Sequence, residues 1–144
     1  MECIRLKAAA VAVSLIAVTT PAALADPVSV IVHPSNSATM GADEITRVFL
    51  GKSRSFPGGG TAVPIDQAEG SDVRDDFSDS VLDKSASQLK AYWAKLVFTG
   101  KGSPPKEVGG DSEVIEVVSS NPNLIGYVRN APGDGSVRVL MTVD

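Results

Sequence analysis

The sequence predicts an α/β protein, a three-layer single domain built around a mainly parallel sheet. Two observations support this fold class. Short β-branched or apolar runs alternate along the chain with segments whose apolar residues recur at helical spacing. Glycine- and proline-rich breaks separate the segments, as at 57–60 and 104–105. One alternative stays open: the last two apolar runs, 124–128 and 137–141, could form a hairpin at one edge, since Asp134-Gly135 between them is a turn signal.

The N-terminal segment has the features of a secretory signal peptide. Arg5 and Lys7 precede an apolar run over residues 8–17, and Ala23-Leu24-Ala25 fits the small-x-small cleavage pattern. The run is too short for a transmembrane helix. We therefore expect a signal peptide over residues 1–25, then one exported domain over 26–144 with no stable membrane insertion.

The composition argues against several classes of function. The single cysteine, Cys3, lies inside the predicted signal peptide, so we expect no disulfide and no thiolate metal site in the exported domain. His33 is the only histidine, and one imidazole does not make a metal site. The formal net charge is −4, and the chain has no basic block. This balance argues against nucleic acid and anionic membranes as partners.

The first half of the domain is predicted to contain two strands and two helices. The run Val28–Val32 is apolar almost throughout, which is typical of a strand covered on both faces. After a turn over 33–37, a helix is expected at about 42–50, with Ile45, Val48 and Phe49 on one face. A second strand at about 62–66 and a second helix at about 72–82 follow.

The second half is predicted to contain two more helices before the late strands. Ser85 and Gln88 form a capping-box pattern at the start of the third helix. Its stripe of apolar residues is expected to face the core, and it consists of Leu89, Tyr92, Trp93, Leu96 and Val97. Residues 101–110 are expected to form a loop. The fourth helix is expected to begin with Asp111 as N-cap.

The main candidate site is the turn between the second strand and the second helix. Gly70 provides the turn, and Ser71 is placed as an N-cap whose oxygen accepts a backbone N–H. Helix N-termini that follow strands bind anions in open α/β proteins, so the N–H groups of residues 71–74 could bind one, with Arg74 as counter-charge. The competing interpretation is an ordinary acidic helix start, because Asp72 and its neighbours Asp75 and Asp76 repel an anion.

Two other groups of residues are weaker candidates. Ser35 and Asn36 follow the first strand, where we expect the carboxyl edge of the sheet, and could contact a ligand or only hold a local turn. The basic residues of two loops could attract an anion or simply be solvated: Lys52, Arg54, Lys101 and Lys106. Since no nucleophile-elbow or metal-ligand spacing is present, we do not expect an enzyme.

Three segments resemble phosphate-type periplasmic solute-binding proteins. Residues 45–52 (ITRVFLGK) resemble the end of one of their helices, and 63–71 (VPIDQAEGS) resemble their strand and phosphate-binding turn. Residues 121–128 (NPNLIGYV) resemble a later strand, and the three segments occur in the family's order. The resemblance implies the type II periplasmic-binding-protein fold. Because the chain has about half the length of two-lobed members, it resembles a single lobe of them.

The resemblance also implies a function. We expect a periplasmic domain that weakly binds phosphate or a related oxyanion, uses no cofactor, and is associated with ABC-type uptake through a permease or another envelope protein. At the turn, Gly70 and Ser71 match the family, whereas Gln67 stands where the family has Arg, and Asp72 and Val73 stand where it has Gly and Thr. The expected ligand-binding residues are Ser35, Asn36, Gln67, Gly70, Ser71, Asp72 and Arg74. The alternative is a ligand-free interaction or sensing module that keeps the fold.

Overall fold

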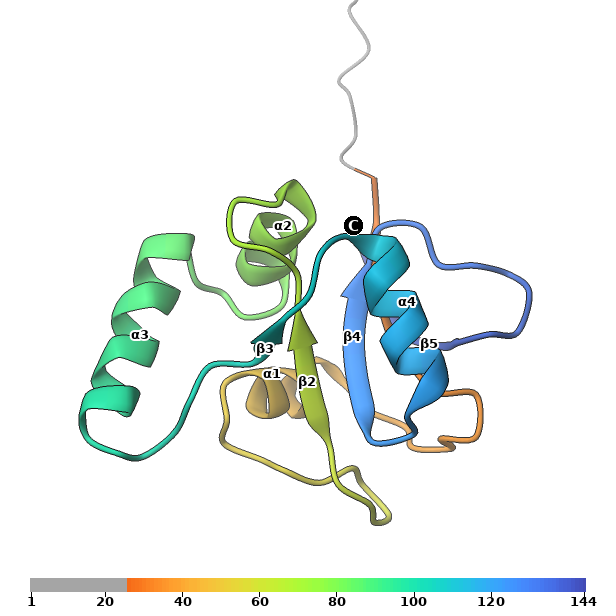
Figure 1. Ribbon diagram of the computed structural model, residues 1–144, viewed down its shortest axis with the longest axis horizontal. Helices are drawn as coiled ribbons and strands as arrows, with labels where there is room; N and C mark the ends of the chain where they lie inside the picture. The colour runs from red at the N-terminus through yellow and green to blue at the C-terminus, as the bar shows by residue number, and fades with distance from the viewer. Residues whose placement is uncertain (1–25) are drawn as a thin grey trace, which may run out of the picture.

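The computed structural model describes residues 26–144, and the predicted signal peptide over residues 1–25 lies outside them. A five-stranded sheet in the order β3-β2-β4-β1-β5 forms the centre (Figure 1). The strands are β1 Val28–Val32, β2 Val63–Asp66, β3 Lys106–Glu107, β4 Leu124–Val128 and β5 Arg138–Val143. The helices are α1 Ala42–Phe49, α2 Asp72–Ser80, α3 Ala86–Phe98 and α4 Asp111–Ser120. In this part of the chain, no helix is long and apolar enough to cross a membrane.

The sheet is mainly parallel, as predicted, with one exception. β2 pairs in parallel with β3 and β4, whereas β1 runs antiparallel to both of its neighbours, β4 and β5. The hairpin alternative for the last two strands is wrong, because β1 lies between them. All five residues of β1 are buried, which suits a strand paired on both edges and covered on both faces.

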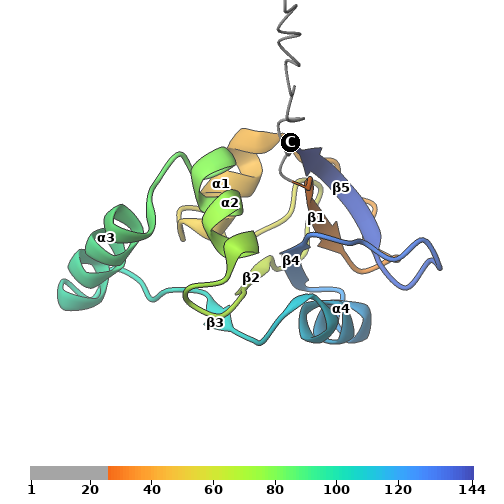
Figure 2. The same ribbon diagram turned by 90° about the horizontal axis from the view of Figure 1, so that it is seen from above.

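Helices cover both faces of the sheet, so the predicted three layers are confirmed. Figure 2 shows α1 and α2 on one face and α4 on the other. Alternate residues of β1 serve the two faces: Val30 and Val32 pack in the cluster with α1 and α2, and Ile31 packs in the cluster with α4. This alternation explains why an uninterrupted apolar run is required at the centre of the sheet.

An aromatic cluster fixes α1 and α2 on the sheet. The predicted α1 stripe is confirmed, since Ile45, Val48 and Phe49 are all buried. The rings of Phe77, from α2, and Tyr127, from β4, stack with centroids 3.9 Å apart and planes 5° apart. Phe49 meets the Phe77 ring edge-on at 4.7 Å. Such packing stabilises aromatic pairs beyond their buried area, and here it holds α2 against the sheet.

The third helix departs from the prediction. Its capping box is formed, since Ser85 and Gln88 each accept the other's backbone N–H. Of the predicted core stripe, however, only Leu89 is buried, and Trp93 remains partly exposed. Figure 2 shows α3 beyond the β3 edge of the sheet rather than over one of its faces. Helical spacing predicts an amphipathic face, but it does not specify what that face packs against.

Two smaller predictions in the second half are also corrected. Residues 101–110 do not form a loop throughout, because β3 lies within them and pairs with β2. α4 begins at Asp111 with Gly110 in the N-cap position, so Asp111 is not the cap. The carboxylate of Asp111 bonds outside its own helix, at the candidate site described next.

Candidate functional site

The site is built where the chain leaves β2, turns at Gly70 and enters α2. Gly70 has a φ of +86°, a conformation that side chains disfavour, so a glycine is required there. Ser71 occupies the predicted N-cap position, but its hydroxyl donates to Gln67 Oε1 at 3.1 Å instead of accepting a backbone N–H. The amides of residues 72–74, in the first turn of α2, have no protein acceptor within the described chain. They are the donors that an anion would use.

Gln67 is part of the protein interior rather than of a ligand surface. Its side chain is 1% exposed, and Nε2 donates to Asp111 Oδ1 at 2.7 Å and to the Tyr127 carbonyl at 3.1 Å. Its Oε1 is occupied by the Ser71 hydroxyl. The amide therefore links the starts of α2 and α4 to the end of β4. Both hydrogens of this amide are therefore donated within the protein, and neither is directed at a ligand.

Arg74 is already paired. Its guanidinium donates to the Gln67 carbonyl at 3.0 Å, forms an ion pair with Glu107 on β3, and lies 3.5 Å from Asp66 Oδ2. These contacts place the only guanidinium of α2 beside two carboxylates. The predicted counter-charge is thus largely neutralised by the protein, and an incoming anion has to compete with Glu107 for it.

Asp66, at the carboxyl end of β2, is a mostly buried acid whose side chain is 15% exposed. Burial raises the pKa of Asp66 above its ordinary value of 3.8, while the hydroxyl of Tyr127, the charge of Arg74 and the backbone N–H of Gln67 oppose the rise. Burial and the neighbouring carboxylate likewise raise the pKa of Tyr127, so its hydroxyl keeps the proton and donates a hydrogen bond to Asp66 Oδ1. Asp66 and Tyr127 therefore form a buried donor–acceptor pair beneath the turn.

The exposed charges around the turn are mostly acidic. Glu69, Asp72 and Asp75 are exposed beside the N-terminus of α2, whereas Asp76 pairs with Arg129. Each unit charge acts on an anion about 4 Å away with roughly 1 kcal/mol in water, and more where solvent is excluded. These carboxylates offset the favourable field of the helix dipole.

A cavity of about 450 Å³ adjoins the turn. Gly70 and Arg74 line it from one side, and Lys90 and Trp93 of α3 line it from the other. Of the predicted ligand residues, only Gly70 and Arg74 face this space, whereas Gln67, Ser71 and Asp72 do not line it. Sequence reasoning missed Lys90, because its place opposite the turn depends on where α3 packs and not on any local motif.

Ser35 and Asn36 lie elsewhere. Because β1 runs antiparallel to β4, the loop after β1 lies where β2 and β4 begin, at the end of the sheet opposite Gly70. The expected placement at the shared carboxyl edge is therefore wrong. The Ser35 hydroxyl is 2.7 Å from His33 Nδ1, and Asn36 Oδ1 accepts the Ala38 N–H at 2.9 Å. These are the local bonds of a turn.

Known structures share this fold, although no family model and no curated protein matches the chain. A protein from Clostridium perfringens, assigned as a phosphate ABC transporter substrate-binding protein and solved with bound phosphate, matches with a TM-score of 0.62 at 21% identity. The match covers 80% of this chain and 44% of that one. An ABC-type phosphate transport receptor from Vibrio cholerae matches with a TM-score of 0.59 and 13% identity. That match covers 80% of this chain and 45% of the receptor.

PstS from Borrelia burgdorferi also matches, with a TM-score of 0.59 and 17% identity over 80% of this chain and 46% of its own. The chain has the fold of one lobe of a phosphate-binding protein. This lobe fold confirms the resemblance and the fold class predicted from the sequence. The chain spans less than half the length of the phosphate-binding proteins that it matches, and at these identities the likeness is one of fold.

Proposed function

We propose that the chain is a periplasmic, single-lobe phosphate-binding-protein-like domain that binds phosphate or a related oxyanion weakly, in association with ABC-type uptake. The observation that most supports this proposal is the set of three unpaired amides at residues 72–74, at the end of a parallel strand. Backbone amides at such a helix N-terminus are directed at an anion and have a favourable dipole behind them. The matched structures are phosphate-binding proteins or transport receptors.

The same site explains why binding should be weak. The side-chain amide of Gln67 donates both of its hydrogens to protein acceptors, and the guanidinium of Arg74 is paired with Glu107 and Asp66. A single lobe leaves one side of the ligand in water, where charge interactions are screened. We expect a dissociation constant of about 1 mM, which corresponds to roughly 4 kcal/mol of binding free energy.

The proposal makes Glu107 an internal competitor of the ligand. The Glu107 side chain is 49% exposed and pairs with Arg74, so replacing it with Gln removes one of the two carboxylates beside the guanidinium. Glu107→Gln should tighten phosphate binding by about fivefold, equivalent to ~1 kcal/mol for a partly exposed ion pair. Arg74→Gln should abolish measurable binding. Glu116→Gln, on the exposed side of α4, is the matched control and should change nothing.

The experiment is a calorimetric titration of the purified protein with phosphate and sulfate at low ionic strength. Saturable heat in the wild type, tightened by Glu107→Gln and lost with Arg74→Gln, would support the proposal. The absence of heat at about 10 mM ligand, in both the wild type and Glu107→Gln, would refute it.

A second candidate function is a ligand-free interaction or sensing module that keeps the fold. The bonds of the Gln67 amide and of the Arg74 guanidinium favour it, because both side chains are bonded to protein groups rather than left free for a ligand. Crosslinking in intact cells distinguishes the two. If a specific envelope protein were crosslinked and the calorimetric titration with phosphate and sulfate gave no binding heat, the interaction module would be supported and phosphate binding would be refuted.

A further inference from the structure

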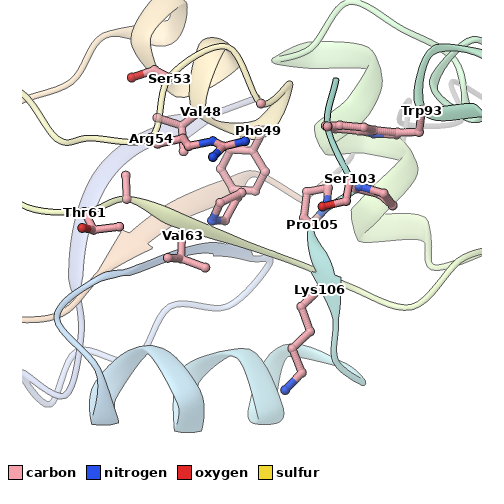
Figure 3. Close-up of a pocket in the computed structure, with 15 residues that line it drawn as sticks. Val48, Phe49, Ser53, Arg54, Thr61, Val63, Trp93, Ser103, Pro105 and Lys106 are labelled. Carbon is pink, nitrogen blue, oxygen red and sulfur yellow. The ribbon is translucent and has the colours of Figure 1, made fainter. Parts of the chain in front are cut away.

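A second cavity, of about 340 Å³, lies next to the cavity beside the Gly70 turn and shares Pro104, Pro105 and Trp93 with it. It is open to solvent and is lined by the end of α1, the start of β2, residues 102–106 and one side chain of α3 (Figure 3). β3 pairs only with Ile65 and Asp66, so the first half of β2 has no neighbouring strand on that edge. Val63, 39% exposed, is left facing this space. The volume lies within the range of small-molecule sites.

The walls of this cavity are largely apolar. They are formed by Phe49, Val63, Pro105 and Trp93. Trp93 lines it at one side, where its indole packs closely against the backbone of Gly51: a Cβ at Gly51 would lie 3.2 Å from the ring. Trp93 was predicted to be a core residue, but it lines a cavity instead, because α3 stands beyond the sheet edge.

Arg54 provides the positive charge of the cavity. Its side chain extends along the cavity toward the side that carries Trp93 and Pro105, whereas Lys106 points away toward α4 (Figure 3). Across residues 26–144, ion pairs involve Arg74 and Arg129 but not Arg54. Arg54 is exposed, and its backbone is held in place, since its carbonyl accepts the Ala62 N–H at 2.9 Å.

We propose that this cavity binds a small organic carboxylate with an aromatic or branched aliphatic body. An unpaired guanidinium suits a carboxylate, to which it donates two parallel hydrogen bonds. The apolar walls and the indole suit a hydrocarbon body, which inorganic phosphate lacks. Although Trp93 and Pro105 also line the cavity beside the Gly70 turn, the cation Arg54 and the wall residues Phe49 and Val63 do not, so the proposal does not depend on the function proposed above.

Fluorescence provides a direct test, because Trp93 is the only tryptophan of the chain. The purified protein is titrated with phenylacetate, with its neutral isostere phenylacetamide, with acetate and with phosphate. We expect a saturable change in Trp93 emission with phenylacetate at about millimolar concentration. Phenylacetamide should bind about fivefold more weakly, because it lacks the charge. Acetate, which carries the charge without the hydrocarbon body, should produce no saturable change. Because Trp93 also lines the cavity beside the Gly70 turn, any phosphate response should persist in Arg54→Gln and be lost in Arg74→Gln.

Arg54→Gln should weaken phenylacetate binding by about fivefold or more and remove its preference over phenylacetamide. Arg47→Gln is the matched control, because Arg47 is exposed on α1 outside this cavity and should leave the titration unchanged. Circular dichroism verifies that both variants are folded. Equal responses to phenylacetate and phenylacetamide, a folded Arg54→Gln variant that binds like wild type, or no saturation at about 20 mM would each overturn the proposal.

Discussion

Replacing Tyr127 with Phe should destabilise the protein more at neutral pH than in acid. The substitution keeps the ring stacked on Phe77 and removes only the hydroxyl that donates to Asp66. The Gln67 N–H, which this hydroxyl accepts at 3.2 Å, retains Asp66 Oδ1 as an acceptor at 3.1 Å. What is lost is therefore a single hydrogen bond to a buried carboxyl group.

The direction of the pH effect follows from the raised pKa of Asp66. Because the folded state holds this proton more tightly than the unfolded chain, the associated stability is present below pH 3.8 and is lost as the pH rises through the folded-state pKa. The Tyr127 hydroxyl limits that loss by stabilising the carboxylate. Without it, the pKa of Asp66 rises further, and the loss of stability with increasing pH becomes larger.

The expected cost is about 1 kcal/mol where Asp66 is protonated and about 2–3 kcal/mol where it is ionised, as for hydrogen bonds to neutral and charged groups. Urea unfolding at about pH 4 and pH 7 measures it, with a midpoint shift that is larger by roughly 0.5–1 M at neutral pH. Tyr92→Phe is the control, since its hydroxyl donates to the neutral Leu50 carbonyl at 2.7 Å. A Tyr127→Phe deficit that is constant with pH, like that of the control, would refute the reasoning.

Three further substitutions test the packing. Gln67→Leu should cost about 2–4 kcal/mol in urea unfolding, because the buried amide makes three hydrogen bonds; a cost below 1 kcal/mol would contradict its inward role. Gly126→Ala should cost about 1–3 kcal/mol, since its Cβ would lie 2.6 Å from Val114 Cγ1 on α4, whereas Gly133→Ala meets open space and should be neutral in the same assay. Phe98→Ser should shift stability by less than about 0.5 kcal/mol, because Phe98 is 93% exposed; a larger loss in thermal unfolding would show that the end of α3 is covered.

Local patterns predicted most of the elements correctly. The uninterrupted run Val28–Val32 indicated a strand covered on both faces, and the spacing of Ile45, Val48 and Phe49 indicated the buried face of α1, because burial imposes those periods on the sequence. The pair Ser85 and Gln88 indicated a helix start, because both of its bonds are local. The apolar stripe of α3 was misassigned to the core because periodicity does not identify the packing partner.

The sequence by itself determined the element types, the layers and the position of the strand–Gly70–helix turn, since these depend on residues close along the chain. Only the tertiary structure decided how these residues combine. Insertion of β1 antiparallel to β4 moved Ser35 and Asn36 to the far end of the sheet. Gln67 bonds to Tyr127, 60 positions away, and Arg74 pairs with Glu107, 33 positions away. Hydrogen-bond partners so distant in the chain have no local periodicity, so folding alone determines whether those groups remain free for a ligand.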